Sequence, residues 1–195
     1  MRTENKKCGD KMRKLIESIE NFIPLCEQEE KDKEIMLRFA QNAPDCLLRD
    51  NKLAHFTASA WIVNREHTKV LFIYHKLYDS WSWVGGHADG NSDLKAAALR
   101  EAREETGISS GKLISDGIFS LEILTVEAHI RKGEYVAPHL HMNLTYLVEA
   151  DENEPLKLNE DETKGVQWFP FEEAFKASTE PKMIERVYKK LSARS

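Results

Sequence analysis

A chain of 195 residues with 41% hydrophobic and 31% charged side chains can build one sizeable core and has the composition of a soluble globular protein. Its net charge of −5, with no basic block, argues against a surface that coats nucleic acid, because such binding draws on clustered positive charge. The polar N-terminal stretch contains no apolar signal segment, and no apolar run is long enough to cross a bilayer. We therefore expect a cytoplasmic protein with no membrane contact.

All three cysteines, Cys8, Cys26 and Cys46, lie in the first 50 residues at wide spacing. An odd number of cysteines without a CxxC pair indicates neither a disulfide framework nor a zinc knuckle. This usage fits a reducing cytoplasm, where disulfides are rare.

The first part of the chain is rich in lysine and glutamate. Apolar residues at helical spacing predict one helix over 12–23, which Pro24 ends, and a second helix over 27–39. We expect a helical extension, residues 1–50, packed on a main domain of residues 51–195. Its apolar stripe could instead contact a partner or a second copy of the chain in a homodimer.

Two runs rich in β-branched and aromatic residues follow at 53–64 and 69–76, separated by a polar turn. This pattern predicts a β-hairpin. Trp81 and Trp83 then alternate along the chain just before the glycine pair at 85–86.

The C-terminal part of the chain contains strand patterns first and helix patterns last. We predict long strands over 117–130 and 139–150 with a turn at 131–133, an acidic loop over 151–165, a short strand ending at Pro170, a helix from Phe171 and a last helix over 182–191. Strands and helices do not alternate regularly, so the fold class is α+β, or an α/β/α sandwich with a mixed β-sheet.

The stretch from Gly85 to Ile108 contains a predicted helix with two different faces. Glu101, Glu104 and Glu105 share one face, because residues three and four apart are neighbours on a helix, while the opposite face is apolar. One of residues 91–93 can cap the helix start, and a glycine at 107 can end it with a positive φ. Converging carboxylates are what Mg²⁺ requires, although a solvated acidic face has the same pattern.

Read as G-x5-E-x7-R-E-U-x-E-E-x-G-U, with U a bulky aliphatic residue, the stretch from Gly86 to Ile108 resembles the Nudix box. The matching positions hold Arg100, Glu101, Glu104, Glu105 and Gly107. Two positions depart from the pattern: Ser92 replaces the first glutamate, and Ala102 is a small version of the aliphatic residue. A match at fixed spacing is more specific than a lone glycine motif.

The resemblance implies a Nudix-type pyrophosphohydrolase that uses Mg²⁺ or Mn²⁺ to cleave a nucleoside diphosphate linked to another group. By position, the backbone carbonyl of Gly85 and the carboxylates of Glu101, Glu104 and Glu105 would bind the metal. Glu101 or Glu104 could polarise the attacking water, and Arg100 would orient Glu104 one turn further on.

A further acid is expected from the acidic loop, where the resemblance favours Glu162 as a base or an extra ligand; a solvated loop is the other interpretation. For the small-molecule substrate, His75 and Lys76 could contact a phosphate and Trp83 could stack on a base. The same tryptophan could equally be a packing residue.

His139 and His141 alternate on a predicted strand, so both side chains point to one face. They could line the substrate or form hydrogen bonds. With His87 or His129 they could instead form a zinc site and make the protein a zinc hydrolase.

Another class of function also fits the residues. The departure at Ser92 could mark a Nudix-like sensor domain that binds a nucleotide-derived ligand without cleaving it. Retention of every metal-binding carboxylate favours the enzyme. The pattern leaves open which group is attached to the diphosphate.

Overall fold

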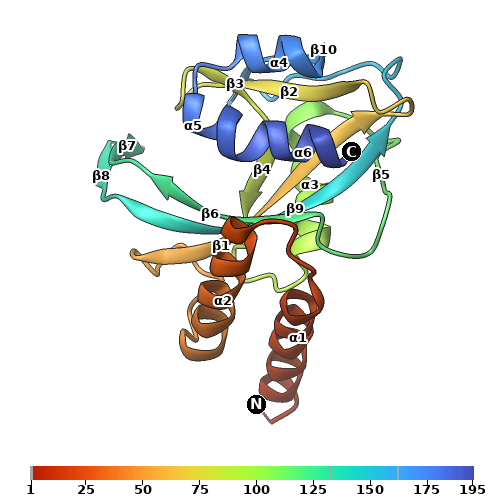
Figure 1. The fold of residues 1–195 in the computed structure, drawn as a ribbon. Coiled ribbons are helices and arrows are strands. Elements are labelled where there is room, and N and C mark those ends of the chain that lie inside the picture. Colours follow the sequence, from red (N-terminus) through yellow and green to blue (C-terminus); the bar gives the residue numbers. More distant parts are fainter. Residues whose placement is uncertain (1, 132, 162) are drawn as a thin grey trace. The chain divides into compact units, whose positions relative to one another are not determined.

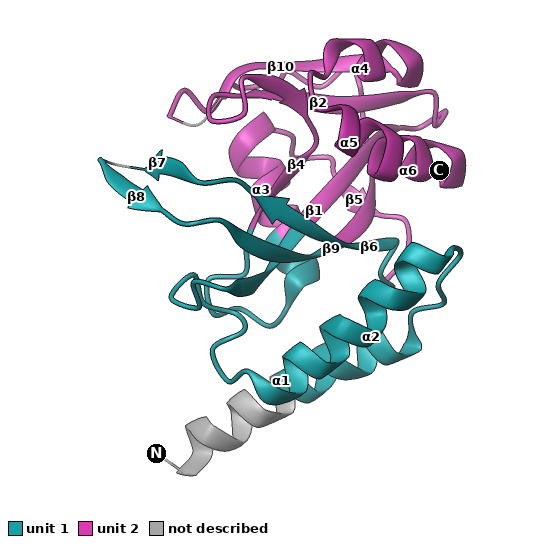
Figure 2. Ribbon diagram, turned by 60° about the vertical axis from the view of Figure 1, so that its left-hand side comes forward, with its two compact units in different colours: residues 1–58, 87–97, 117–144 teal, residues 59–86, 98–116, 145–195 magenta. Residues whose placement is uncertain are grey.

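The computed structural model describes residues 2–131, 133–161 and 163–195, with the side chains of the first helix described from residue 12 onward (Figure 1). The chain forms two compact units (Figure 2). Unit 1 contains residues 1–58, 87–97 and 117–144, and unit 2 contains residues 59–86, 98–116 and 145–195. No helix in the described part of the chain has the length and apolar character needed to span a bilayer.

The predicted helical extension is confirmed in unit 1, where α1 (Arg2–Asn21) packs against α2 (Glu27–Asn42). Ile19 and Met36, one from each helix, are fully buried. Helix α1 ends at Asn21, shortly before Pro24, which cannot continue a helix. Buried residues of both helices therefore form a core, while Ile35 of α2 remains 48% exposed.

Helix α2 is also joined to strand β6 (Ser120–Val126) by acidic side chains. The hydroxyl of Ser120 donates to a carboxylate oxygen of Glu29 at 2.7 Å, and the backbone N–H of Ile123 donates to Asp32 at 2.9 Å. Glu29 is fully buried, and a buried carboxylate is tolerated only when such hydrogen bonds replace water. These contacts fix helix α2 on this strand.

The single strand predicted over 117–130 is wrong in its extent. The structure contains β6 and a separate β7 (His129–Arg131), which pairs with β8 (Glu134–Val136) in a two-stranded sheet. Strand β6 instead pairs with β9 (His139–Ala150). Strands β6 and β7 belong to different sheets, so the chain leaves the β6–β9 ladder after Val126. Residue 132 of the predicted turn lies outside the described residues.

The predicted hairpin is confirmed: β1 (Ala54–Asn64) and β2 (Lys69–His75) are antiparallel, with Val63 opposite Val70. The strands that have residues in unit 2 follow the hydrogen-bonded order β10-β2-β1-β9-β5. At the ends of this order, β10 (Thr163–Pro170) pairs with β2, and β5 (Lys112–Leu113) pairs with β9. Two further short strands join the sheet: β3 (Ser80–Ser82) pairs with β2, and β4 (Val84–His87) pairs with β1.

The C-terminal helices of unit 2 are α4 (Phe171–Ala177), α5 (Pro181–Met183), the π-helical turn η1 (Ile184–Tyr188) and α6 (Lys189–Arg194). Tyr188 is fully buried, with its ring 5.0 Å from Phe72 and 6.0 Å from Trp61. Two sheet strands and the last helices thus share one aromatic core. The last helix was predicted as one regular segment, which the π-helical turn interrupts.

Gly107 ends helix α3 (Leu94–Thr106) with a φ of +75°, and its N–H donates to the carbonyl of Arg103 at 2.9 Å. A Cβ at this position would lie 2.5 Å from the Cβ of Lys157 and 2.9 Å from its backbone nitrogen. Glycine is therefore required both by its dihedral angle and by the close approach of another segment.

We expect the Gly107→Ala substitution to lower the free energy of unfolding by about 1–3 kcal/mol, since it adds backbone strain and a steric clash. Urea unfolding followed by circular dichroism measures this change. The control is Gly117→Ala, because a Cβ there meets nothing within 4 Å. Equal stability of the two variants would contradict the role assigned to Gly107.

Candidate active site

Helix α3 carries Glu101, Glu104 and Glu105. A capping side chain fixes the start of this helix, and buried apolar residues fix its inner face. Asp93 accepts a hydrogen bond from the backbone N–H of Ala96 at 3.0 Å, as an N-cap does. Leu94, Ala98 and Ala102 are buried. The helix therefore cannot rotate without exposing its apolar face, which fixes the direction of the carboxylates.

Glu101 lies directly against Gly86 of strand β4. A Cβ added to Gly86 would lie 2.5 and 2.6 Å from the two carboxylate oxygens of Glu101, well inside van der Waals contact. The Glu101 side chain is 15% exposed, so its carboxylate is held at the surface of the core rather than in open solvent. Only glycine at position 86 leaves room for this carboxylate.

Glu105 and Glu104 differ in their surroundings. Glu105 is buried, and one of its carboxylate oxygens accepts a hydrogen bond from the backbone N–H of Gly85 at 3.3 Å. The Glu104 side chain is 58% exposed. Two carboxylates of the predicted metal site thus face the glycine pair, and the third is open to solvent.

Arg100 contacts two of these acids. Its Nη2 lies 2.6 Å from Oε1 of Glu101, whereas its Nε lies 3.8 Å from Oε2 of Glu104. Arg100 thus lies within ion-pair distance of both acids, and the expectation that it orients Glu104 stays a prediction. The less exposed Glu101 provides the shorter, charge-assisted contact, because an exposed carboxylate remains solvated.

The acid expected from the loop at 151–165, Glu162, lies outside the described residues. Its neighbours contact the end of strand β2. The ammonium of Lys76 donates to the backbone carbonyl of Glu160, and His75 lies opposite Thr163 in the β2–β10 ladder. The two predicted phosphate contacts therefore lie beside the loop segment that precedes β10.

Trp83 is a core residue. It is 9% exposed, and its ring packs edge-on against Tyr188 with centroids 5.9 Å apart. This burial favours Trp83 as a packing residue over the hypothesis that it stacks on a substrate base, because little of the side chain is left for a ligand to contact. The alternation of Trp81 and Trp83 is that of a strand in which one side chain enters the core.

Four imidazoles gather in unit 1. His139 and His141 project from the same face of β9, as predicted, with ring centroids 5.1 Å apart. His55 lies 5.0 Å from His139 and 4.9 Å from His141, and His87 lies 4.9 Å from His141. His129 is further away, 6.4 Å from His139.

Burial disfavours the charged form of three imidazoles of this cluster, those of His55, His87 and His141. Burial, with smaller contributions from nearby positive groups, lowers the pKa of both His87 and His141 to about 2. Burial also lowers the pKa of His55. Sequence reasoning missed His55, since nothing near it in the chain indicates that its strand and β9 bring the two histidine positions together.

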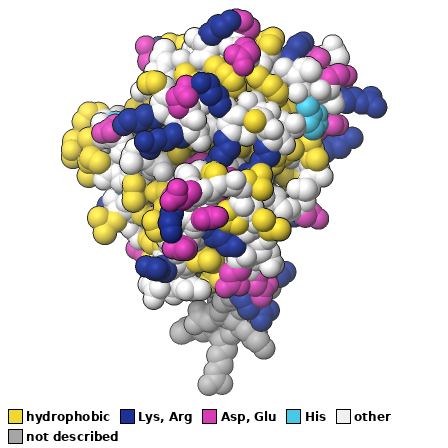
Figure 3. All heavy atoms as spheres, in the orientation of Figure 1, with side chains coloured by type: hydrophobic (Ala, Val, Ile, Leu, Met, Phe, Trp, Pro, Cys, Tyr) yellow, Lys and Arg dark blue, Asp and Glu magenta, His cyan; other side chains and the backbone are white. Residues whose placement is uncertain are grey.

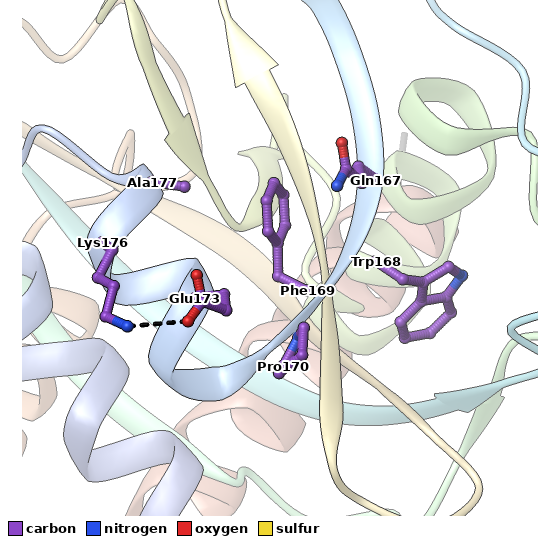
Figure 4. A pocket seen from close by; sticks show the side chains of 7 residues that line it. All are labelled: Gln167, Trp168, Phe169, Pro170, Glu173, Lys176 and Ala177. Carbon is purple, nitrogen blue, oxygen red and sulfur yellow. Dashed lines mark hydrogen bonds and ion pairs between the residues drawn. The ribbon is translucent and has the colours of Figure 1, made fainter.

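A surface groove lies elsewhere in unit 2 (Figure 4). It has a volume of about 440 Å³ and is lined by residues 167–170 of β10 and by Glu173, Lys176 and Ala177 of α4. The ammonium of Lys176 donates to Glu173 at 2.8 Å across its edge. None of these residues belongs to the stretch from Gly85 to Ile108, so the groove is no part of the carboxylate site.

Basic and acidic side chains of the described residues are interspersed on the face drawn in Figure 3. The net charge of the full sequence is −5.

Residues 53–191 match the model of the NUDIX domain, and the chain therefore belongs to the Nudix family. This membership makes the protein an enzyme that acts on phosphoric anhydrides. The comparison with curated protein sequences gave no match.

Solved structures of Nudix enzymes share the fold. An Ap4A hydrolase of C. elegans is 22% identical, with a TM-score of 0.52 over 71% of this chain and 95% of its own. A NUDIX-family hydrolase of Clostridium perfringens is 22% identical, with a TM-score of 0.51 over 72% and 98%. The E. coli dihydroneopterin triphosphate pyrophosphohydrolase is 15% identical, with a TM-score of 0.53 over 72% and 96%. At these identities the likeness confirms the α+β fold with its mixed sheet.

The contact between Gly86 and Glu101 can be tested by adding a side chain at position 86. We expect Gly86→Ala to lower kcat/KM about 100-fold on a substrate that the wild type hydrolyses, because the new methyl group displaces the Glu101 carboxylate. Steady-state kinetics measure the loss, and circular dichroism checks that the variant is folded.

A double-mutant cycle with Glu101→Gln is the control for this prediction. If Gly86 acts through Glu101, the double variant loses little more activity than Glu101→Gln alone. Additive losses would show that Gly86 acts by another route.

Proposed function

We propose that the protein is a pyrophosphohydrolase that uses Mg²⁺ or Mn²⁺ to cleave the diphosphate of a small nucleoside diphosphate derivative. One observation carries this proposal. Glu101 and Glu105 hold their carboxylates against the Gly85-Gly86 segment, where a side chain on Gly86 would displace the carboxylate of Glu101.

The residues present fit a hard divalent cation. Glu101, Glu104 and Glu105 supply carboxylate oxygens from one helix, and Mg²⁺ and Mn²⁺ prefer oxygen ligands to imidazole or thiolate. The missing side chain of Gly86 leaves room for the Glu101 carboxylate, which a Cβ would overlap. These three glutamates, with the backbone carbonyl of Gly85, would hold the cation.

A cation bound there would neutralise charge on the diphosphate and lower the pKa of a water molecule. The protein residues supply position and charge. Arg100 holds the carboxylate of Glu101 through its 2.6 Å contact, and the backbone N–H of Gly85 holds Glu105. Both interactions fix the carboxylates before substrate binds, which lowers the cost of reorganisation during the reaction.

Hydrolysis requires a base for the attacking water. The water oxygen forms a bond to phosphorus, the bridging P–O bond breaks, and the water proton passes to a carboxylate. Glu104 is suited to this role, because its exposed side chain can reach solvent water while Arg100 lies 3.8 Å away. Glu101 and Glu162 remain candidates for the same role or for a further ligand.

The departure at Ser92 does not weaken the start of the helix. Asp93 caps α3, and its own backbone N–H donates to the side-chain oxygen of Asn91 at 3.0 Å. The loop is thus ordered by these two side chains without a glutamate at position 92. This observation favours the enzyme over a sensor domain that has lost its catalytic site.

This chemistry defines the set of compounds to be tested as substrates, called here the substrate panel. Nucleoside triphosphates, nucleotide sugars, dinucleotides, coenzymes and capped RNA all present a phosphoric anhydride to the same carboxylates. The similar Ap4A hydrolase and dihydroneopterin triphosphate pyrophosphohydrolase add Ap4A and dihydroneopterin triphosphate to the panel. His75 and Lys76, at the end of β2, are proposed to contact the phosphate groups.

We expect turnover of at least one panel member with Mg²⁺ or Mn²⁺ and none with chelator. The substitution Glu104→Gln should lower kcat at least about 100-fold, because it removes an anionic ligand or base without changing the shape of the side chain. Release of phosphate or nucleotide measures both effects.

Glu172→Gln is the matched control, since it makes the same change at an exposed position of helix α4. It should leave turnover unchanged. A folded wild type that binds panel members and cleaves none of them would contradict the proposal and support the sensor domain.

A further inference from the structure

Unit 1 contains a group of imidazoles that takes no part in the proposed hydrolysis. One ring nitrogen from each of His55, His139 and His141 lies within 4.8 Å of the other two. His55 is in β1, and the other two histidines are in β9. The group is therefore mounted on strands rather than on mobile loops, a placement typical of precise ligand sites.

The spacing of two of these nitrogens matches coordination of one ion. Nε2 of His139 lies 3.2 Å from Nε2 of His141. Two imidazole nitrogens bound to one tetrahedral zinc ion at about 2.0–2.1 Å lie about 3.3–3.4 Å apart. The strand alternation thus already brings the two donor atoms to nearly the distance that such an ion requires.

Backbone carbonyls select the tautomers that leave Nε2 available. Nδ1 of His55 lies 3.1 Å from the carbonyl oxygen of Asn51, and Nδ1 of His139 lies 2.9 Å from that of Ala137. A carbonyl oxygen can only accept, so each Nδ1 carries a hydrogen, and in the neutral ring Nε2 then carries the lone pair. Metal-binding histidines are commonly oriented by this same contact.

His55 provides an independent observation. It is 4% exposed, and its Nε2 is buried with no hydrogen-bond partner among the described residues. A buried nitrogen without a partner is costly, and such groups are rare in native structures. The His55 ring lies 4.9 Å from His141 and 5.0 Å from His139, so a ligand of these two residues would also meet it.

We propose that His55, His139 and His141 form a binding site for a zinc-class transition-metal ion, separate from the carboxylates that would hold Mg²⁺ or Mn²⁺. Neutral imidazoles suit Zn²⁺ and its neighbours Co²⁺, Ni²⁺ and Cu²⁺ far better than they suit Mg²⁺. Three protein ligands leave a fourth position for water or for the neighbouring His87, whose ring lies 4.9 Å from His141.

Nearby positive charge opposes a cation here, but much of it is balanced. Arg49 is one such group near His87, and it forms two hydrogen bonds with Asp89 at 2.6 and 2.7 Å. Lys52 and Arg131 are the other basic residues near the histidines. These basic side chains could attract an anion such as inorganic phosphate. Titration with phosphate therefore tests whether the cluster is an anion site.

The experiment uses the full chain, stripped of metal with a chelator that is then removed, in buffer containing millimolar Mg²⁺. Titration with Zn²⁺ by calorimetry should give one site per chain. Titration with Co²⁺ should give the visible absorption bands of tetrahedral cobalt. Excess Mg²⁺ competes for oxygen sites but not for imidazole, and the histidine variants identify the part of the signal that comes from the histidines.

Each of His139→Ala and His141→Ala should weaken Zn²⁺ binding at least about 100-fold and remove the cobalt bands. The matched control is His67→Asn, which removes an imidazole from a turn in unit 2 and keeps a side chain that tolerates its φ of +52°. It should bind as the wild type does. Circular dichroism checks the fold of each variant, and the wild-type cobalt spectrum tests the site even if a variant unfolds.

Two results would overturn the proposal. One is the absence of a stoichiometric Zn²⁺ site and of cobalt bands in the wild type. The other is heat from titration with inorganic phosphate that the His141→Ala variant abolishes, with no response to Zn²⁺, which would make the cluster an anion site. Glu104→Gln should bind Zn²⁺ normally, so a failure of the proposed hydrolysis leaves this test intact.

Discussion

The close approach of Glu101 to Gly86 is the contact on which the candidate active site depends. A carboxylate can lie against a strand backbone only where no Cβ intervenes, and a Cβ on Gly86 would lie 2.5 Å from the carboxylate. Every neighbouring feature maintains this contact: buried alanines fix the rotation of helix α3, Arg100 holds the carboxylate at 2.6 Å, and Gly107 ends the helix. The acidic cluster is thus a property of the strand and the helix together.

The parts of the site that could be predicted from the sequence are those set by local geometry. Carboxylates three and four residues apart share a helix face whatever the rest of the chain does, and a glycine after the last turn indicates the stop. Alternation along β9 likewise placed His139 and His141 on one face, and their rings lie 5.1 Å apart. In each case the residues concerned lie within, or directly after, a single helix or strand.

The parts that could not be predicted depend on pairing between distant segments. His55 joins the two histidines of β9 from another strand, and no periodicity within the first strand encodes that placement. Trp83 enters the core because its ring meets Tyr188, more than a hundred residues later in the chain. The division of the predicted strand over 117–130 has the same cause, since β6 and β7 join different sheets.

The two groups of polar side chains differ in the chemistry of their donor atoms. Helix α3 offers carboxylate oxygens, of which Glu104 is more than half exposed, and these suit a hard cation that keeps part of its water shell. The histidines offer imidazole nitrogens, with His55 buried, and these suit a softer ion that gives up its water readily. Charge makes the same distinction, because anionic oxygens attract any cation whereas neutral imidazoles select by ligand preference. The two donor sets thus favour different ions, which is the basis of the two proposed sites.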